Sequence, residues 1–470
     1  MTHTKLATSK IAHCQRLKSF RAGAAFMLAP LILMVATTMV ASAQTYTDLY
    51  NLWGRRGVSP SLSALAQGRD GNLYGTAAGG GTTAEGVVFN ITPNGKQTVL
   101  HRFDGADGAD PVGPTLGTDG NFYGVTLSGG ADGEGTIFKM TKSGSLTNLY
   151  SFTGPARPYS APVEGTDGKF YGTTNSDFTA GTAYKITPSG QFTSLGSIPS
   201  YSAASLLQGT DGNFYGTTGG GGTSQSGTVF KITPSGRVSV LYSFDGTHGL
   251  TPEGPVIQGS DGNFYGTTTF GGAYNDGGVA FKLTPQGAIT VLHNFNDPNY
   301  TNDGEFPEAG LVQATDGNFY GVTVDGGTTG LGVIFKITPA GDYSILYNFD
   351  VTHGAQPEST PMQHTNGKIY GLTFYGGAHD RGVVYSLDVG LGPFVSLLPS
   401  SGKVGRTIEV LGQGFTGTTS VFFNGSAATF RVVSDTYLTA VVPVGATTGF
   451  VSVITPGGTL KSNKEFRVTP

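Results

Sequence analysis

The sequence predicts an all-β protein: a seven-bladed β-propeller closed by an N-terminal strand, followed by a small β-sandwich. The motif Asp-Gly-Asn-x-Tyr-Gly, or a close variant of it, occurs seven times at steps of 44 to 55 residues, and a period of that length is typical of propellers. Each copy contains short apolar runs between Gly, Asp and Pro, without a helical period. The repeated tyrosines are Tyr74, Tyr123, Tyr171, Tyr215, Tyr265, Tyr320 and Tyr370.

The first 43 residues have the pattern of a secretory signal peptide. Five basic residues precede any acidic one, and an uncharged run from Ala22 to Ala43 closes on Ala41-Ser42-Ala43, a small-residue cleavage pattern. An uncleaved membrane anchor is the alternative, because a run of this length can span a bilayer, although Pro30 favours the leader. We expect bacterial-type export to the medium, periplasm or cell surface, with no membrane span after cleavage.

The composition of the mature chain narrows the possible partners. The leader takes five of the 27 Lys and Arg residues and none of the 31 Asp and Glu residues, which leaves a net charge of −9. This charge argues against nucleic acid as a partner. The single cysteine, Cys14, leaves with the leader, so we expect a fold without disulfides, stabilised by packing and hydrogen-bonded sheets.

One repeat, residues 252–295, illustrates the predicted blade. Its apolar runs at 255–258, 264–269, 279–284 and 288–295 are joined by Asp261-Gly262, a glycine-rich loop at 270–278 and Pro285-Gln-Gly287. Glycine accepts the positive φ of a tight turn, and proline fixes φ for its first corner. Four antiparallel strands with two apolar faces describe a propeller blade.

The ends of the repeat region predict how the propeller closes. The fourth-strand pattern begins at Leu100, Leu149, Leu195, Leu241, Leu292 and Leu346, and the last repeat continues into Ser386-Leu-Asp-Val without a copy of its own. Residues 45–52 have the same pattern, with no repeat before them. We predict that this N-terminal strand completes blade seven, which removes the open sheet edges.

The repeats resemble a known family. Residues 209–236 contain Gly-Thr-Asp-Gly-Asn-Phe-Tyr-Gly-Thr-Thr, a Gly-Gly loop and Gly-Thr-Val-Phe-Lys-Ile-Thr-Pro-Ser-Gly, which is similar to the GloVer (choice-of-anchor) tandem repeat of bacterial exported proteins. The resemblance covers about residues 46–388. It weakens at Asn175-Ser-Asp-Phe-Thr, where Gly-Gly is lost, and at Ser386. The family is defined by its repeat, so the resemblance implies no activity.

The repeat period stops after Gly392, and short alternating runs with turn residues predict the β-sandwich. Their order, with Pro399-x-x-Gly, Gly412-x-x-Phe, Phe423-Asn-Gly and Val442-Pro, resembles the immunoglobulin-like IPT/TIG domain over about residues 392–468. In exported proteins such domains resemble spacers or adhesion modules, whereas a relative in transcription factors helps to bind DNA; the acidic chain and its leader favour the former. We therefore expect a signal peptide at 1–43, a propeller at 44–391 and an IPT/TIG domain at 392–470.

No motif predicts catalysis or a metal site. The Asp and Lys residues present in nearly every copy are expected to serve the blade. His101 and His293 share one repeat position, and His248 and His353 another; residues spread over different blades do not converge on one ion. The acidic loops 104–110 and 297–305 are the candidates for calcium. Their spacing is not that of a calcium-binding loop, so we expect no cofactor. Because no catalytic motif is present either, we expect no catalytic residue.

The predicted loops are unequal on the two faces of the propeller. First-to-second and third-to-fourth turns share one face and are tight, whereas second-to-third loops and blade-to-blade crossings share the other and vary in length. Variable loops on a rigid scaffold are where binding usually occurs. The candidate ligand-binding residues on the variable face are Tyr159, Tyr201, Phe270, Tyr274, Asp276, Tyr300, Asp325, Phe374, Tyr375, His379, Asp380 and Arg381.

These residues favour a non-enzymatic binding or adhesion protein, because aromatic rings beside carboxylates suit extracellular glycans or proteins. One alternative is a propeller enzyme, a glycoside hydrolase or polysaccharide lyase, with Asp276, Asp325, Asp380, Arg381 or His379 near the axis. Another is a structural cell-surface component without a pocket in the variable face. The aromatic residues could also simply cover the ends of the blades.

Overall fold

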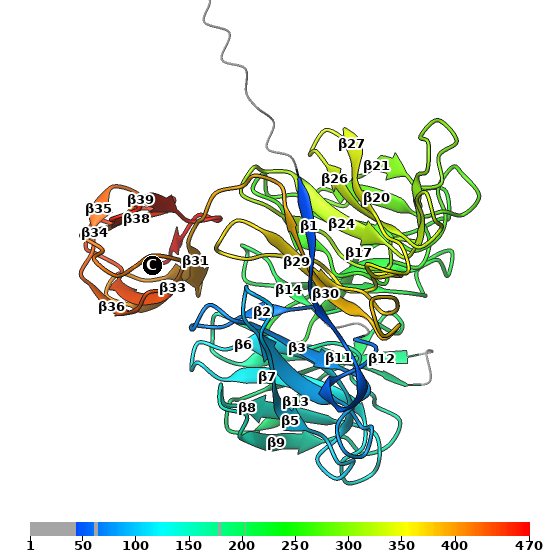
Figure 1. The fold of residues 1–470 in the computed structure, drawn as a ribbon, viewed down its shortest axis with the longest axis horizontal. Coiled ribbons are helices and arrows are strands. Elements are labelled where there is room, and N and C mark those ends of the chain that lie inside the picture. Colours follow the sequence, from blue (N-terminus) through cyan, green and yellow to red (C-terminus); the bar gives the residue numbers. More distant parts are fainter. Residues whose placement is uncertain (1–43, 61–63, 177–179, 203) are drawn as a thin grey trace, which may run out of the picture. The chain divides into compact units, whose positions relative to one another are not determined.

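The computed structural model describes residues 44–60, 64–176, 180–202 and 204–470. The predicted signal peptide lies outside the described residues. The described chain consists of strands and one short 3-10 turn, η1 (Gly54–Arg56), with no α-helix, as Figure 1 shows. No described helix is long and apolar enough to cross a membrane. The prediction of an all-β fold is confirmed.

Seven four-stranded antiparallel sheets follow the repeats in the described residues, and we number them 1 to 7. From first to fourth strand, sheet 1 is β2–β5 (Ala66–Gln67, Leu73–Ala77, Val87–Ile91, Gln97–Arg102), sheet 2 is β6–β9 (Ala109–Leu116, Phe122–Ser128, Thr136–Met140, Leu146–Ser151) and sheet 3 is β10–β13 (Val163–Glu164, Phe170–Ser176, Ala180–Ile186, Phe192–Ile198). Sheet 4 is β14–β17 (Leu207–Gln208, Phe214–Thr218, Thr228–Ile232, Val238–Ser243), and sheet 5 is β18–β21 (Ile257–Gln258, Phe264–Thr268, Val279–Leu283, Ile289–Asn294). Sheet 6 consists of β23, β24, β26 and β27 (Val312–Gln313, Phe319–Thr323, Val333–Ile337, Tyr343–Asn348), and sheet 7 of β28, β29, β30 and β1 (Met362–Gln363, Ile369–Leu372, Val383–Asp388, Thr45–Asn51).

The N-terminal strand belongs to the last sheet, as its sequence pattern predicts. β1 runs antiparallel to β30, and Thr45 lies opposite Asp388. Val384 of β30 packs in one apolar cluster with Leu73 and Phe89 of sheet 1. The first and last sheets are therefore in contact, and β30 has no open edge at this position.

Neighbouring sheets are joined by the repeated tyrosine. Its aromatic ring lies against the first residue of the second strand in the next sheet, so each repeat completes the core of its neighbour. The ring-centroid distances are 3.9 Å for Tyr74–Phe122, 3.7 Å for Tyr123–Phe170, 3.9 Å for Tyr171–Phe214, 4.3 Å for Tyr215–Phe264 and 4.0 Å for Tyr265–Phe319. In the last two junctions the first residue of the second strand is aliphatic: Tyr320 shares an apolar cluster with Ile369, and Tyr370 shares one with Leu73.

The recurring Asp and Lys residues serve the sheets, as predicted. In sheet 5 the carboxylate of Asp261 accepts hydrogen bonds from the Asn263 side chain (2.7 Å) and the Tyr265 hydroxyl (2.8 Å), and it pairs with Lys282 (2.9 Å). Burial raises the pKa of Asp261, but the hydrogen bonds from Lys282, Asn263 and Tyr265 outweigh it and lower the pKa to about 2. The Asp–Lys pairs at Asp119–Lys139 and Asp211–Lys231 repeat this arrangement.

A side-chain hydrogen bond also joins neighbouring sheets at the turn face, which we define by the first-to-second turns (68–72, 117–121, 165–169, 209–213, 259–263, 314–318 and 364–368). Gln258, at the end of β18, accepts the backbone N–H of Thr210 from the preceding sheet (2.9 Å). The equivalent acceptor–donor pairs are Glu164–Thr118, Gln208–Thr166, Gln313–Ser260, Gln363–Thr315 and Gln67–Thr365. At the junction of sheets 1 and 2, Leu116 stands at the acceptor position and Arg69 at the donor position.

The C-terminal strands form the predicted β-sandwich. One sheet contains β31 (Ser396–Leu398), β33 (Thr407–Leu411), β37 (Tyr437–Val441) and β36 (Phe430–Ser434); the other contains β35 (Ser426–Ala427), β34 (Ser420–Phe423), β38 (Val451–Thr455) and β39 (Gly458–Lys461). β32 (Ser401–Gly402) pairs in parallel with β40 (Arg467–Val468). Ile408, Phe415 and Val453 are fully buried in the shared core.

Candidate functional site

The loop face is the side of the propeller that holds the second-to-third loops and the crossings between sheets. Its described segments are the loops 78–86, 129–135, 219–227, 269–278, 324–332 and 373–382 and the crossings 52–60, 103–108, 152–162, 199–202, 244–256, 295–311 and 349–361. Four aromatic side chains of the described residues are 39 to 48% exposed, namely Trp53, Phe270, Tyr300 and Tyr375. All four lie on the loop face, where an exposed aromatic surface is available to a ligand.

A pocket of about 450 Å³ opens on the loop face between sheets 5 and 6. It is formed by the crossing 295–311 and the loop 324–332, which are joined by the two-stranded sheet β22 (Gly304–Glu305) and β25 (Asp325–Gly326). The lining residues are Asn296, Asp297, Pro298, Tyr300, Asn302, Asp303, Glu305, Asp325, Gly326, Gly327 and Gly330. The structure thus brings two predicted site residues, Tyr300 and Asp325, to one pocket.

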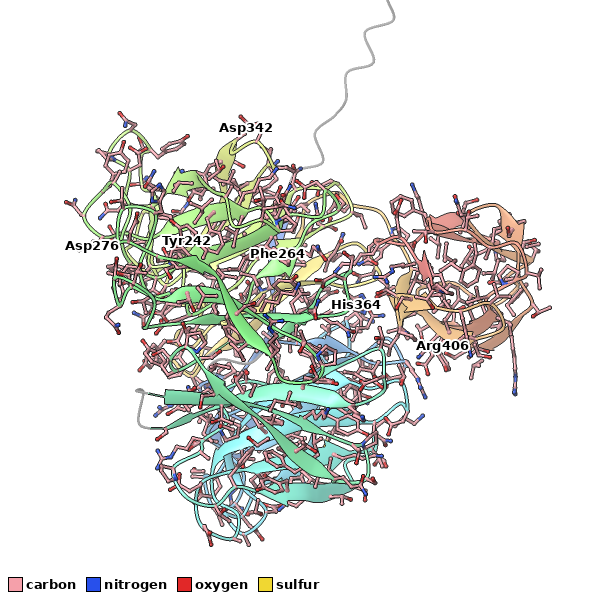
Figure 2. All side chains as sticks on the ribbon, turned by 180° about the vertical axis from the view of Figure 1, so that it is seen from behind. Tyr242, Phe264, Asp276, Asp342, His364 and Arg406 are labelled. Carbon is pink, nitrogen blue, oxygen red and sulfur yellow. The ribbon has the colours of Figure 1, made fainter. Side chains whose placement is uncertain are left out.

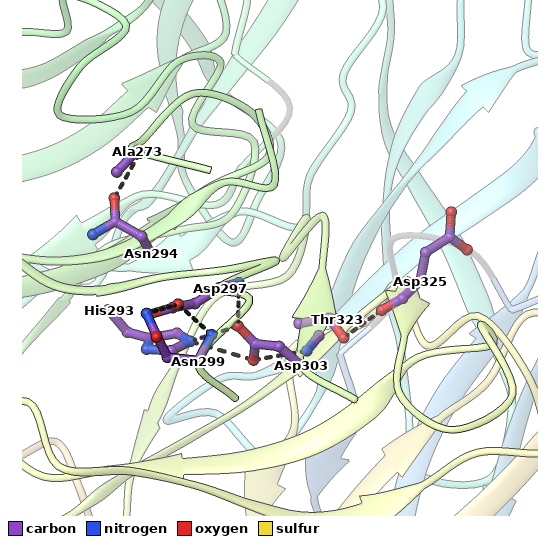
Figure 3. A network of polar contacts seen from close by, with 9 residues as sticks. Ala273, His293, Asn294, Asp297, Asn299, Asp303, Thr323 and Asp325 are labelled. Carbon is purple, nitrogen blue, oxygen red and sulfur yellow. Dashed lines mark hydrogen bonds and ion pairs between the residues drawn. The ribbon is translucent and has the colours of Figure 1, made fainter. Parts of the chain in front are cut away.

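A buried histidine–aspartate pair, whose two side chains Figure 3 shows, supports the crossing that forms one side of this pocket. Asp303 is almost fully buried, and its carboxylate accepts the backbone N–H of Asp297 (3.0 Å) and lies 3.1 Å from Nε2 of His293. His293 stacks on Tyr343 at 3.8 Å, and Tyr300 meets the same imidazole edge-on at 5.1 Å. These contacts hold the crossing in one path and place the Tyr300 ring, which is 42% exposed, at the pocket wall.

Four carboxyl groups line the pocket, those of Asp297, Asp303, Glu305 and Asp325, and its lining residues include no Lys or Arg. Glu305 lies opposite Asp325 in the β22–β25 pair. Burial raises the pKa of Glu305, and repulsion from Asp325 and Asp303 raises it further. Carboxylate oxygens only accept hydrogen bonds when they are ionised, so this pocket suits a ligand that donates several hydrogen bonds.

Three glutamates on neighbouring crossings form a second feature of the loop face. Glu253, Glu308 and Glu358 stand just before the first strands of sheets 5, 6 and 7, where these sheets approach each other; for example, the N–H of Gly310 donates to the hydroxyl of Thr360 (3.0 Å). We call these three residues the inner glutamates.

The inner glutamates are partly buried and repel one another. Burial raises the pKa of Glu308 to about 7, and the nearby carboxylates of Glu253 and Glu358 contribute. Burial raises the pKa of Glu358 to about 7 as well. Glu253 accepts a hydrogen bond from the Thr269 hydroxyl (3.0 Å), and burial raises its pKa. Carboxyl groups that titrate near neutrality are able to exchange protons with a ligand at physiological pH.

The inner glutamates are not among the site residues predicted from the sequence. They stand in short stretches before the first strands, outside the long loops that vary in length. The signal that identifies them is a Pro-Glu dipeptide at one repeat position, at 252–253, 307–308 and 357–358, which the first four repeats lack. Only the packing of neighbouring sheets brings these positions together.

The other predicted site residues are distributed over the loops of sheets 3 to 7. Tyr159 and Tyr201 are half-buried on the crossings that lead into sheets 3 and 4. Phe270 lies edge-to-face against Phe306 at 5.4 Å. In the same loop Tyr274 is half-buried and Asp276 is exposed, as Figure 2 shows for Asp276. These residues do not converge on one site.

The loop 373–382 of sheet 7 contains the remaining five predicted residues, Phe374, Tyr375, His379, Asp380 and Arg381. Phe374 and Tyr375 meet edge-to-face at 4.5 Å. His379 lies 5.7 Å from the indole of Trp53, which sequence analysis did not single out. Asp380 accepts the backbone N–H of Gly376 (3.0 Å) and so stabilises the loop itself. Of the acidic residues predicted for an enzyme, Asp325 is the one that interacts with an inner glutamate, Glu308.

The acidic loop 104–110 is occupied by its own contacts. Asp107 lies 2.6 Å from Nε2 of His101, and Asp104 accepts the backbone N–H of Ala106 (3.0 Å). The other three histidines of the two repeat positions also pair with aspartates, in His248–Asp245, His293–Asp303 and His353–Asp350. Within residues 44–470, leaving out the undescribed positions, no group of three or more His, Cys, Asp or Glu side chains is arranged to hold a metal ion.

Comparison with known proteins supports both parts of the architecture. Residues 35–205 and 201–427 match the Gloeobacter/Verrucomicrobia repeat, and residues 394–468 match the IPT/TIG domain. The resemblances found in the sequence are thereby confirmed. No curated protein sequence matches the chain.

Solved structures with related architecture share little sequence with this chain. A streptogramin B lyase is 17% identical, covers 73% of this chain and 97% of its own, and has a TM-score of 0.53. An oligogalacturonate lyase in complex with manganese is 12% identical, covers 73% of this chain and 92% of its own, and has a TM-score of 0.49. A gluconolactonase from Xanthomonas campestris is 12% identical, covers 74% of this chain and 90% of its own, and has a TM-score of 0.41. The similarity to the first confirms the propeller fold and says nothing about activity.

Proposed function

The chain belongs to the Gloeobacter/Verrucomicrobia repeat family, and we propose that it is an exported, non-enzymatic binding protein whose loop face holds an extracellular glycan. The observation that carries this proposal is the pocket between sheets 5 and 6. Tyr300, 42% exposed, stands at its wall beside the carboxylates of Asp297, Glu305 and Asp325. A sugar ring has an apolar face that stacks on an aromatic side chain and hydroxyl groups that donate to carboxylates.

The distribution of exposed aromatic side chains supports a glycan over a protein ligand. Trp53, Phe270 and Tyr375 stand on loops separate from Tyr300. Separate platforms on one face suit an extended polysaccharide, whose successive rings contact one platform each. A protein partner would instead favour one contiguous apolar patch.

Export rests on the predicted leader. Expression of the full-length chain in a bacterial host, followed by N-terminal sequencing of the protein outside the cytoplasm, tests this part. We expect the sequence to start at Gln44. Recovery of an intact N-terminus in the membrane fraction would favour an uncleaved anchor.

An array of glycans and polysaccharides, probed with the secreted protein, tests the binding site. Tyr300→Ala should weaken binding about tenfold, because the loss of one stacking contact is worth roughly 1 to 1.5 kcal/mol. Tyr375→Ala tests a platform outside the pocket. Val240→Ala is the matched control, since Val240 is 48% exposed on β17, away from the loop face. Binding that survives both tyrosine substitutions, or a wild-type protein that binds no glycan, would refute the proposed site.

The inner glutamates favour a second candidate function, a glycoside hydrolase or polysaccharide lyase. Glu308 and Glu358 have pKa values raised to about 7 by burial, as a general acid or base at neutral pH requires. Incubation with each bound polysaccharide, followed by measurement of new reducing ends and of unsaturated uronate, tests this candidate. Product release that Glu308→Gln abolishes, with binding retained, would replace the binding proposal by an enzyme; absence of product would support binding alone.

A further inference from the structure

The junction between sheets 1 and 2 lacks the hydrogen bond that links the other neighbouring sheets at the turn face. Elsewhere a Gln or Glu side chain accepts the N–H of a Thr or Ser in the preceding sheet. Here the acceptor position is Leu116 and the donor position is Arg69. The substitution of Leu for Gln removes the acceptor and leaves an apolar side chain at this position.

The IPT/TIG domain covers that apolar surface. Leu116 and Tyr74 of the propeller share one cluster with Leu398, Leu411 and Tyr437 of the C-terminal domain. Leu411 is 6% exposed. Because the burial of apolar side chains is favourable, these residues stabilise the contact between the domain and the propeller.

Arg69 supplies the polar part of the same junction. Its Nη2 donates to the carbonyl oxygen of Thr118 in sheet 2 (3.0 Å), so the side chain itself bridges the two sheets. Glu409 of the IPT/TIG domain holds the guanidinium with both carboxylate oxygens, at Nε (2.8 Å) and at Nη2. Because a guanidinium group fits a carboxylate in one planar arrangement, Glu409 fixes the direction in which Arg69 points.

Further contacts extend along the turn face to sheet 7. The Thr436 hydroxyl donates to the carbonyl oxygen of Arg69 (2.8 Å). Gln413 donates to the hydroxyl of Thr365 (2.9 Å), and the N–H of Phe394 donates to the carbonyl oxygen of the same residue (3.0 Å). The domain thus contacts the first-to-second turns of sheets 7 and 1, where the last sheet meets the first, and Arg69 links it to the turn of sheet 2.

We propose that the IPT/TIG domain acts as a clamp on the propeller, with Glu409 and Leu411 completing the junction of sheets 1 and 2 in place of the missing Gln side chain. In this arrangement the domain is a structural part of the propeller rather than a spacer that moves freely behind it. The proposal does not depend on the ligand of the loop face.

Hydrogen–deuterium exchange of the full secreted chain tests the clamp. The amides of Gly71 and Gly120 close the two turns concerned, by hydrogen bonds to Gly68 and Gly117. In the double variant Glu409→Gln/Leu411→Ala we expect exchange in turns 68–72 and 117–121 to rise at least tenfold, with turns 209–213 and 259–263 unchanged. The control Glu465→Gln alters an exposed glutamate of the same domain and should leave all turns unchanged.

A rescue variant separates the clamp from simple damage to the C-terminal domain. Arg69→Thr/Leu116→Gln restores the residues of the other junctions, so the chain should keep both turns protected even when Glu409→Gln/Leu411→Ala is added. Unchanged exchange in the unrescued double variant would overturn the proposal. A rise in exchange in all seven turns, or a failure of the restored residues to protect turns 68–72 and 117–121, would overturn it as well.

Discussion

Replacement of Glu308 by Gln should stabilise the protein at alkaline pH and leave it unchanged at acidic pH. Burial, together with the carboxylates of Glu253, Glu358 and Asp325, raises the pKa of Glu308 from its ordinary value of 4.5 to about 7. The folded state therefore holds its proton more tightly than the unfolded chain does. Its contribution to stability is fully present below pH 4.5 and is lost as the pH rises through about 7.

The size of the effect follows from the two pKa values. One pKa unit corresponds to about 1.4 kcal/mol, so the shift sets an upper limit of about 3 kcal/mol for the folding penalty of ionised Glu308 at pH 8.5. The side chain is only partly buried, and solvent screening reduces this figure, so we expect about 1 to 3 kcal/mol. A glutamine of similar shape carries no charge at any pH and removes the penalty.

Thermal unfolding at pH 4.5 and at pH 8.5 measures the effect. For a propeller of this size we expect Glu308→Gln to raise Tm by about 1 to 4 °C at pH 8.5 and by nothing at pH 4.5. The exposed Glu465→Gln, with the same chemical change, should match the wild type at both pH values. An equal Tm difference at the two pH values, or a lower Tm of the variant at pH 8.5, would refute the electrostatic reasoning.

Three further predictions concern stability. Gln258→Leu leaves the N–H of Thr210 without its acceptor and should cost about 1 to 3 kcal/mol in denaturant unfolding; a midpoint equal to the wild type would contradict the link between sheets. Burial lowers the pKa of His364, so the folded protein favours the neutral imidazole, and Tm should fall as the pH drops below about 6.5. The fall in Tm should be smaller in His364→Gln. Parallel Tm profiles of the two proteins would argue against a contribution of His364 to the pH dependence. Tyr265→Phe removes the hydroxyl that donates to Asp261 and should cost about 1 kcal/mol by calorimetry, whereas an unchanged unfolding free energy would mean that water replaces the bond.

The sheets could be predicted from the sequence because their signals are local. Asp261-Gly262 marks a turn whatever surrounds it, and the strand that follows, Phe264–Thr268, occurs with little change in the other repeats. The N-terminal strand was found by comparison of its pattern with six other copies. Each repeat can be compared with the others. The N-terminal segment, which has no repeat before it, could therefore be assigned to the last sheet, which had no fourth strand of its own.

The sites could not be predicted to the same extent because they depend on contacts between repeats. Two of the predicted residues, Tyr300 and Asp325, share a pocket. Its wall depends on the pairing of His293 with Asp303, which the residues around His293 in the sequence do not reveal. The inner glutamates come together only when sheets 5, 6 and 7 pack. Arg69 and Glu409 are 340 residues apart. Arg69 looks unusual only when the seven repeats are compared, and Glu409 lies outside the repeats.

The pairing of β1 with β30 has a consequence for biogenesis. β1 is the first strand of the propeller to be synthesised and β30 the last that precedes the IPT/TIG domain, so Thr45 cannot pair until Asp388 has been made. Closing a loop of such length carries an entropic cost that shorter contacts do not, and it slows folding. Until β30 has formed, the edge of β1 is unpaired and can associate with a strand of another chain.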